Sequence, residues 1–382
     1  MRRIHRRTFL ASGVAAFAAT GLASAQAPNA ARSLDRIASS KGLYFGTAVR
    51  MEELASEPDL SAAVLSQCSR LTPELALKWA SIEPQRGQLN FAGADDLCGF
   101  ALQNGKKVRG HTLLWHDSVP DWAPPLLREP GGWLIVSRYF GSIIPRFGDI
   151  VTTWDVVNEP IEIAHGRPDG LRANAFLQAF GDGYVGRALA EARLFAPKGV
   201  LMINEYGLEY DTEEHQARRR ALLGLIERLR KEGAPLAGLG LQSHLDLRKG
   251  RVSQPALRAF LDAVMDLGLF VEVTELDVKE ADYTAAPEAR DAVVADEARR
   301  YLDVVLDARR VAGVSTWGLS DRRSWLEVTP EDRARFPDAW RDGSSPGVNR
   351  GLPLDASMRE TPMYAAIVQS LDARRQFPAF AP

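Results

Sequence analysis

Short apolar runs alternate with longer amphipathic stretches along most of the chain. Eight of these runs are rich in aliphatic and β-branched residues, and we predict each as a buried strand. The stretches between them repeat apolar positions at helical spacing, as in RRRALLGLIERLRKEG at 218–233, where Gly233 is expected to end the helix. The predicted strands are Tyr44–Ala48, Leu71–Leu77, Lys107–Leu114, Thr152–Val157, Val200–Tyr206, Gly238–His244, Leu269–Leu276 and Gly313–Trp317.

Eightfold alternation of strand and helix predicts parallel β/α units that close on themselves. We therefore expect an α/β fold of the single (β/α)8 TIM barrel type. An open, doubly wound sheet is the alternative. That fold usually has a glycine-rich turn after its first strand, and Gly46-Thr47-Ala48 is not such a turn.

Composition places the chain among globular proteins with a sizeable core. It has 382 residues, of which 46% are hydrophobic and 25% charged, and α/β barrels often reach this length as one domain. The formal net charge of -2 argues against a nucleic-acid partner. The two cysteines, Cys68 and Cys98, are too few for a disulfide scaffold. We expect two buried thiols, with a disulfide as the alternative.

The N-terminus has the pattern of an export signal. A basic start leads into an Ala/Gly-rich apolar run and a small-residue site at Ala23-Ser24-Ala25, and Arg6-Arg7-Thr8-Phe9-Leu10 resembles a bacterial twin-arginine signal. We predict export by that pathway to the periplasm or beyond, with no membrane anchor once the signal is removed. The expected divisions are 1–25 signal peptide, 26–40 lead-in, 41–375 catalytic domain and 376–382 short tail.

Polar and aromatic residues recur where the predicted strands end. Examples are Lys78-Trp79, Trp115-His116, Asn158-Glu159 and Glu275-Leu276-Asp277. The carboxyl ends of barrel strands carry the active site in this fold. The repetition predicts a polar, aromatic-lined bowl at one end of an apolar barrel.

Two carboxylates, Glu159 in TWDVVNEP and Glu275 in VEVTELDV, each follow or end a β-rich run. Alone, each could be a strand-end residue in a salt bridge. Together they match the needs of glycosidic bond cleavage, where one acid protonates the leaving oxygen and one carboxylate attacks or guides water. Such a pair works when its two pKa values are pushed apart.

Three tryptophans point to a sugar ligand. Trp115, Trp317 and Trp325 follow predicted strands, and aromatic faces stack on the C–H faces of sugar rings. A lone Trp is more often part of the core, but three near one rim favour a binding site. A metal site is disfavoured because His111 and His116 lack the HExxH spacing, and we expect no metal and no cofactor.

A series of motifs along the chain resembles those of glycoside hydrolase family 10, the endo-β-1,4-xylanase family of (β/α)8 barrels. The similarity spans about residues 41–372, in matching order and spacing. Its motifs are FGTAV at 45–49, EPQRGQLNF at 83–91, GHTLLWH at 110–116, WDVVNEP at 154–160, INEY at 203–206, GLQSHL at 240–245, VTELDV at 273–278, STWGLSDRRSW at 315–325 and GLPLDASMRETPMYAAI at 351–367.

The resemblance implies a role for each matching residue. Glu159 matches the general acid/base and Glu275 the nucleophile of a retaining enzyme, whose carboxyl groups stand about 5–5.5 Å apart. His244 would hold the nucleophile ionised, and Asn158 would bind the sugar 2-hydroxyl. Tyr206 matches a position near the leaving group. The remaining implied sugar-binding residues are Glu74, Lys78, His111, Trp115, Gln242, Trp317 and Trp325.

Three positions depart from the family pattern. Leu75 stands where an Asn usually binds a distal xylose, and Asp117-Ser118 replaces Ser-Gln, so a second sugar-facing amide is missing. Leu326 follows Ser-Trp where Arg is usual. Each lost polar contact would weaken xylan binding by about 0.5–1.5 kcal/mol, or the site is reshaped for another substrate.

The leading functional hypothesis is therefore a monomeric retaining endo-β-1,4-xylanase acting on xylan or xylo-oligosaccharides through a covalent glycosyl-enzyme intermediate. One alternative is a family 10 hydrolase with altered specificity for another β-glycoside, which Leu75 and Ser118 motivate. Another is a non-catalytic carbohydrate-binding barrel. Transglycosylation would use the same residues as hydrolysis.

Overall fold

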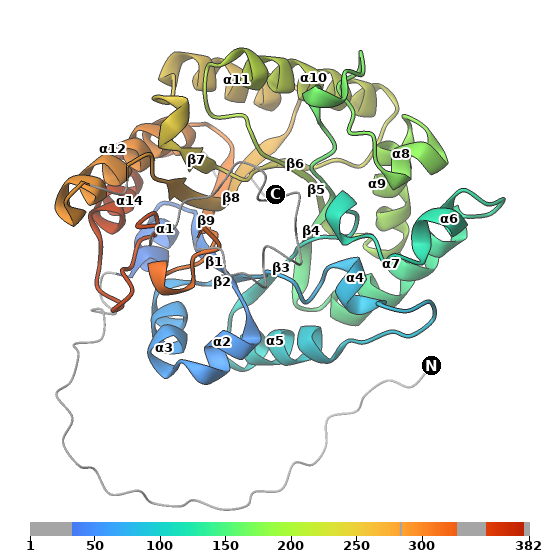
Figure 1. The fold of residues 1–382 in the computed structure, drawn as a ribbon, viewed down its shortest axis with the longest axis horizontal. Helices are drawn as coiled ribbons and strands as arrows, with labels where there is room; N and C mark the ends of the chain where they lie inside the picture. The colour runs from blue at the N-terminus through green and yellow to red at the C-terminus, as the bar shows by residue number, and fades with distance from the viewer. Residues whose placement is uncertain (1–32, 283–284, 327–348, 378–382) are drawn as a thin grey trace, which may run out of the picture.

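The computed structural model describes residues 33–282, 285–326 and 349–377. The predicted signal peptide, 1–25, lies outside the described residues. Viewed down the shortest axis, the strands form a central ring and the helices surround it (Figure 1). In these three ranges no helix combines the length and apolarity needed to cross a bilayer.

The sheet is parallel and closes on itself, which confirms the barrel and removes the open-sheet alternative. Neighbours follow the order β6-β5-β4-β3-β2-β1-β9-β8, and β6 pairs with β8 to close the ring. The barrel strands are β1 Tyr44–Val49, β2 Arg70–Pro73, β3 Lys107–Gly110, β4 Val151–Asn158, β5 Val200–Glu205, β6 Gly238–Leu241, β8 Phe270–Lys279 and β9 Val311–Thr316.

A ninth strand, β7 (His244–Asp246), follows β6 after a break at Gln242 and Ser243 and pairs with the far end of β8. Sequence analysis had merged β6 and β7 into one strand, Gly238–His244, and that prediction was wrong. Ser243 interrupts the run because its φ is 64°, a left-handed conformation that cannot continue a strand. β8 instead runs on to Lys279, past the predicted end at Leu276.

The helices cover the outside of the ring, and each buries one apolar stripe. Helix α7 is typical: Val136, Tyr139, Phe140 and Ile143 recur at helical spacing and are buried. The helices are α1 Leu34–Ser40, α2 Met51–Ser56, α3 Pro58–Gln67, α4 Trp79–Ile82, α5 Ala92–Gln103, α6 Ala123–Leu127, α7 Trp133–Phe147, α8 Ala175–Phe180, α9 Tyr184–Phe195, α10 Glu213–Lys231, α11 Gln254–Asp266, α12 Pro287–Val305 and α14 Pro362–Ala373.

The two cysteines are free and buried. Cys68 is the C-cap residue of α3, and Cys98 lies within α5. The alternative of a disulfide between them is therefore wrong. Burial raises the pKa of both thiols, to about 12 for Cys98. Both are held as neutral, apolar core residues.

Charged residues fill one layer of the barrel interior. The guanidinium of Arg109 on β3 contacts Asp155 on β4, with Nε 2.9 Å from Oδ2, and also contacts Glu272 on β8. All three side chains are essentially inaccessible to solvent. Buried charges persist when each is paired and hydrogen-bonded, and here the pairing ties three strands together across the core.

Candidate active site

A cleft of about 790 Å³ opens where the barrel strands end. All twelve residues that sequence analysis selected line it. They come from segments spread over most of the chain, and the closed barrel brings them together because its strands are parallel. The twelve are Glu74, Lys78, His111, Trp115, Asn158, Glu159, Tyr206, Gln242, His244, Glu275, Trp317 and Trp325.

Glu275 owes its position to the extended end of β8. In a strand, side chains two residues apart point to the same face, so Glu275 and Asp277 lie side by side. β7 pairs with this segment so that His244 lies opposite Asp277. The imidazole of His244 therefore lies between two carboxylates, with Nε2 3.2 Å from Glu275 Oε2 and Nδ1 2.9 Å from Asp277 Oδ1.

The charge of His244 follows from this arrangement. Burial by itself would lower its pKa, but Asp277 and Glu275 together hold the pKa well above its usual value. His244 is thus a cation at neutral pH. The indole of Trp325 donates a hydrogen bond to the other oxygen of Asp277, which fixes the orientation of the whole group.

Two side-chain amides connect Glu275 with Glu159 across the cleft. Asn204, at the end of β5, donates to Glu275 Oε1 at 2.6 Å and to Asn158 Oδ1 at 2.8 Å. Asn158 in turn donates to Glu159 Oε1 at 3.0 Å. The two carboxylates therefore belong to one hydrogen-bonded network, although they are far apart in the sequence.

Glu159 lies one residue beyond β4 and has a φ of 54°, which is unusual for any residue except glycine. Gln242 donates to its Oε1 at 3.1 Å, and His116 Nδ1 lies 3.7 Å from its Oε2. Burial would raise the pKa of Glu159, but its interactions with His116 and Arg172 lower it to about 2. The surroundings of Glu159 therefore favour its carboxylate form.

Lys78 and two aromatic rings form one end of the cleft. The Lys78 ammonium lies 4.1 Å from the centre of the Trp115 ring and 5.8 Å from that of Trp317. Burial lowers the pKa of Lys78, while Glu74, Glu275 and Glu159 oppose that shift. Cation–π contact helps to retain the charge in this partly dehydrated position.

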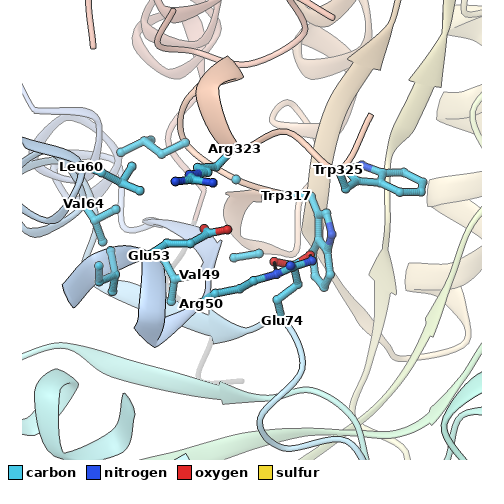
Figure 2. Close-up of a pocket in the computed structure, with 13 residues that line it drawn as sticks. Val49, Arg50, Glu53, Leu60, Val64, Glu74, Trp317, Arg323 and Trp325 are labelled. Carbon is cyan, nitrogen blue, oxygen red and sulfur yellow. Dashed lines mark hydrogen bonds and ion pairs between the residues drawn. The ribbon is translucent and has the colours of Figure 1, made fainter. Parts of the chain in front are cut away.

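Glu74 is held at the same end by Arg50. Arg50 Nε and one terminal nitrogen bind the two oxygens of Glu74 at 2.7 and 2.8 Å, a bidentate pair. Figure 2 shows this pair beside the ring of Trp317, with Glu53 and Arg323 lining the same small side pocket. A polar ligand at Glu74 would therefore meet a carboxylate of fixed orientation.

His111 links the cleft to the charged layer inside the barrel. Its Nδ1 lies 3.0 Å from Asp155 Oδ2, and its ring meets Trp317 edge to face at 5.3 Å. The opposite end of the cleft contains Tyr206, whose hydroxyl accepts from Arg172 at 2.9 Å and donates to Glu162 at 3.0 Å. The Tyr206 hydroxyl thus has both a donor and an acceptor, and His111 is oriented through its Nδ1.

The three departures from the expected pattern differ in their location. Leu75 and Leu326 line the cleft, and so does Asp117. Ser118 does not: it is buried, and its hydroxyl accepts from the Ala80 amide at 3.4 Å. Leu75 and Leu326 can therefore affect a ligand directly, whereas Ser118 supports the backbone.

Sequence analysis did not assign a role to four residues that hold this site together. Asn204 and Asp277 lie in the quoted motifs INEY and VTELDV, and His116 directly follows Trp115, so their strand-end positions were an available signal. Arg172 lies in an irregular segment without periodicity, and nothing in the sequence alone indicated that it reaches Glu159.

Comparisons with known proteins agree with this geometry. The model of glycosyl hydrolase family 10 matches residues 33–370. Endo-1,4-beta-xylanase 3 of Hypocrea jecorina is 30% identical over 89% of this chain and 86% of its own length. Endo-1,4-beta-xylanase A of Fusarium oxysporum is 29% identical over 87% and 95%.

Solved structures give the same result. Native xylanase 10B from Thermotoga maritima superposes with a TM-score of 0.77 at 26% identity, covering 89% of this chain and 98% of that one. Xylanase 10B from Thermotoga petrophila, solved in complex with xylobiose, gives the same score and identity over 89% and 97%. The chain belongs to glycosyl hydrolase family 10 and is a glycoside hydrolase.

Proposed function

We propose that this protein is a retaining endo-β-1,4-xylanase that hydrolyses xylan or xylo-oligosaccharides by double displacement. The observation that carries the proposal is the hydrogen-bonded network that joins Glu159 and Glu275 in one cleft through Asn158 and Asn204. The names of the related enzymes support the substrate class.

In the first step Glu275 attacks the anomeric carbon and forms a glycosyl ester, while Glu159 gives its proton to the departing sugar oxygen. In the second step Glu159 removes a proton from water, which attacks the same carbon and releases Glu275. Asn204 and the His244 cation each contact one oxygen of Glu275 and orient it as the nucleophile.

Glu159 must be protonated for the first step, although its surroundings lower its pKa to about 2. A sugar in the cleft displaces water from this carboxylate, and this desolvation favours its neutral form. The Arg172 cation and the hydrogen bond from Gln242 favour the carboxylate that the second step uses as a base. Substrate binding thus changes the balance between the two forms.

The stacking and polar residues divide between the two sides of the scissile bond. Glu74, Lys78, His111, Trp115 and Gln242 would bind the sugars on the non-reducing side. Trp317 and Trp325 would enclose the central sugars, and Tyr206 would lie near the leaving group. Asn158 would bind the 2-hydroxyl next to the cleaved bond.

Replacement of each carboxylate tests the mechanism. Glu275→Ala should abolish turnover of xylan and aryl β-xylobioside, and an unchanged rate would rule out the site. Glu159→Ala should still form the covalent intermediate from substrates with good leaving groups, and azide should rescue its breakdown. Proton NMR of the first product should show the β-anomer; an initial α-anomer would contradict retention.

A second candidate is a related β-glycosidase with altered specificity, since Leu75 and Leu326 present apolar surface to the cleft. Reducing-sugar release from plain xylan, compared with turnover of aryl β-xylobioside and cellobioside, separates the two. Turnover of another glycoside without xylan cleavage would favour the second candidate.

We also propose export through the twin-arginine pathway, which the pattern Arg6-Arg7-Thr8-Phe9-Leu10 supports. Cell fractionation should find the processed protein outside the cytoplasm. Replacing both Arg6 and Arg7 with lysine should retain the unprocessed chain inside. Export of that variant at the normal rate would contradict the proposal.

A further inference from the structure

Arg172 lies at the end of a segment that folds back against the turn carrying Glu159. Ile161 and Leu171 form an antiparallel bridge, and the Arg172 amide donates to Pro160 O at 2.7 Å. These contacts place the side chain beneath Glu159, where it is 7% exposed. The segment is irregular, so its position depends on these specific bonds.

The guanidinium binds the backbone and the side-chain surroundings of Glu159 at once. Its Nε donates to Glu159 O at 2.9 Å, and one terminal nitrogen donates to Tyr206 Oη at 2.9 Å. The same nitrogen lies 3.2 Å from Glu162 Oε2 and 3.9 Å from Glu159 Oε2. A planar fork can reach all of these atoms, whereas an ammonium group cannot.

The turn requires such an anchor because Glu159 has a left-handed backbone conformation. The amide of Glu159 is fixed by Asn204 O on β5 at 2.8 Å. Arg172 fixes the carbonyl on the other side. With both of its peptide groups bonded, Glu159 has a defined direction before any ligand arrives.

We propose that Arg172 is a positioning residue for the acid/base: it holds Glu159 in its left-handed turn, aims its carboxyl group at the glycosidic oxygen, and stabilises the carboxylate form. The inference rests on the proposed role of Glu159. The side chain of Arg172 also lines the cleft. In this scheme it makes no bond to the reacting atoms and acts on the proton-transfer step through Glu159.

Several other charged groups surround Glu159, and the test has to separate them from Arg172. Lys78 supplies positive charge, and the imidazole of His116 lies 3.7 Å from Glu159 with a pKa that burial lowers. Glu162 supplies a carboxylate, and Glu205 supplies a carboxyl group whose pKa burial raises to about 8. Arg218 offers a matched control. It is buried in the same cluster and binds Ile161 O at 2.7 Å and Glu162 at 3.3 Å, but no contact between it and Glu159 is present in the described residues.

The experiment compares Arg172→Met, Arg172→Lys and Arg218→Met on two aryl β-xylobiosides, one with a dinitrophenyl and one with a phenyl leaving group. Arg172→Met should lower kcat/KM about tenfold to a hundredfold for the phenyl substrate, which needs a well-placed acid. It should change kcat/KM for the dinitrophenyl substrate by less than about twofold, because that group leaves without a proton.

Carboxyl ¹³C NMR of Glu159 gives a second measurement that does not depend on activity. Its pKa should rise by about one unit in Arg172→Met, because a neighbouring cation is lost. It should stay unchanged in Arg218→Met and in Arg172→Lys. Arg172→Lys should nevertheless lose activity on the phenyl substrate, since the lysine keeps the charge without the fork.

Equal losses on both substrates in Arg172→Met, or the same leaving-group dependence in Arg218→Met, would overturn the inference and leave Arg172 with a purely structural role. An unmoved Glu159 pKa in Arg172→Met would also overturn it. If Arg172→Met does not fold, Arg172→Lys carries the kinetic test. Failure of the wild type to cleave any β-xyloside would instead defeat the proposed function, and the NMR titration would still test the positioning of Glu159.

Discussion

The side-chain amide of Asn204 donates a 2.6 Å hydrogen bond to Glu275 Oε1. Asn204 is itself oriented by Thr274, whose hydroxyl donates to Asn204 Oδ1 at 2.7 Å. Because the amide also binds Asn158, one buried residue positions both carboxylates of the proposed catalytic pair. The chain fixes this residue on β5, between the strands that carry Glu159 and Glu275.

Asn204→Ala should therefore impair catalysis more than substrate binding. A hydrogen bond to a charged group contributes about 1.5–3 kcal/mol, which predicts a fall in kcat of roughly tenfold to a hundredfold. KM for xylotriose should change little. Steady-state kinetics check this, with Thr274→Val as a control that should show a smaller loss because the amide of Asn204 remains.

Replacement of His244 should shift the acidic side of the pH–rate profile. His244 supplies the positive charge between Glu275 and Asp277, and its own pKa is held well above the usual value by those carboxylates. Without that cation, His244→Gln leaves two like charges side by side, which favours protonation of the pair. The acidic limb of kcat/KM should move to higher pH by about one unit.

If the acidic limb of kcat/KM in His244→Gln moves to lower pH, or stays in place with a uniformly lower rate, His244 acts only through packing. Trp325→Phe is a suitable companion variant. It removes the indole hydrogen bond to Asp277 but keeps the cation, so the acidic limb should stay near its wild-type position.

An amide at position 75 should improve binding on the non-reducing side. Leu75 lines the cleft near Glu74 and offers no hydrogen bond to a sugar hydroxyl. Leu75→Asn should lower KM for xylotriose about twofold to tenfold, as one new hydrogen bond allows. Ser118→Asn should bring no such gain because Ser118 does not line the cleft. A rise in KM for Leu75→Asn would indicate a site adapted to a less polar ligand.

The buried carboxyl group of Asp321 should make the free energy of unfolding decrease as pH rises. Burial raises its pKa to about 8, and in the described residues its Oδ2 has no hydrogen-bond partner. The folded protein keeps this proton up to about pH 8, while the unfolded chain loses it above about pH 4. Stability should therefore fall as pH rises between these values, by up to about 1.4 kcal/mol per unit.

Asp321→Asn mimics the protonated acid, so its stability should be less dependent on pH and should exceed that of the wild type near pH 8. Urea unfolding at pH 5 and pH 8 measures both effects. Asp291→Asn is the contrasting variant: it removes a carboxylate paired with Arg350 and should lose stability at both pH values. A wild-type protein with equal stability at pH 5 and 8 would contradict the assignment.

The strand starts and the site were more predictable than the strand ends. β3 and β6 begin at the expected residues, Lys107 and Gly238. The predicted strands Leu71–Leu77 and Lys107–Leu114 extended too far because Leu77, Leu113 and Leu114 are fully buried. Leu77 lies in a turn, whereas Leu114 still forms one parallel bridge with Val157 beyond the end of β3. An apolar run alone cannot distinguish these cases from a continuous strand.

The family motifs were sufficient to place twelve residues in one cleft, since parallel strands bring their carboxyl ends together. The contacts among them were not predictable. The link from Asn204 to both carboxylates depends on the register of β5 against β4 and on side-chain direction. The reach of Arg172 depends on a loop closure that no local pattern encodes.

The pairing of β7 with the end of β8 gives the two proposed catalytic acids, Glu275 and Glu159, unequal structural support. Glu275 belongs to β8, so displacing it requires breaking the hydrogen bonds between β7 and β8. Glu159 stands beyond its strand and depends on neighbouring side chains and a returning loop. Segments held this way open at lower free energy than a sheet does. We expect mild heating to impair proton donation by Glu159 first. The enzyme should then still form the glycosyl ester of Glu275 from substrates with good leaving groups.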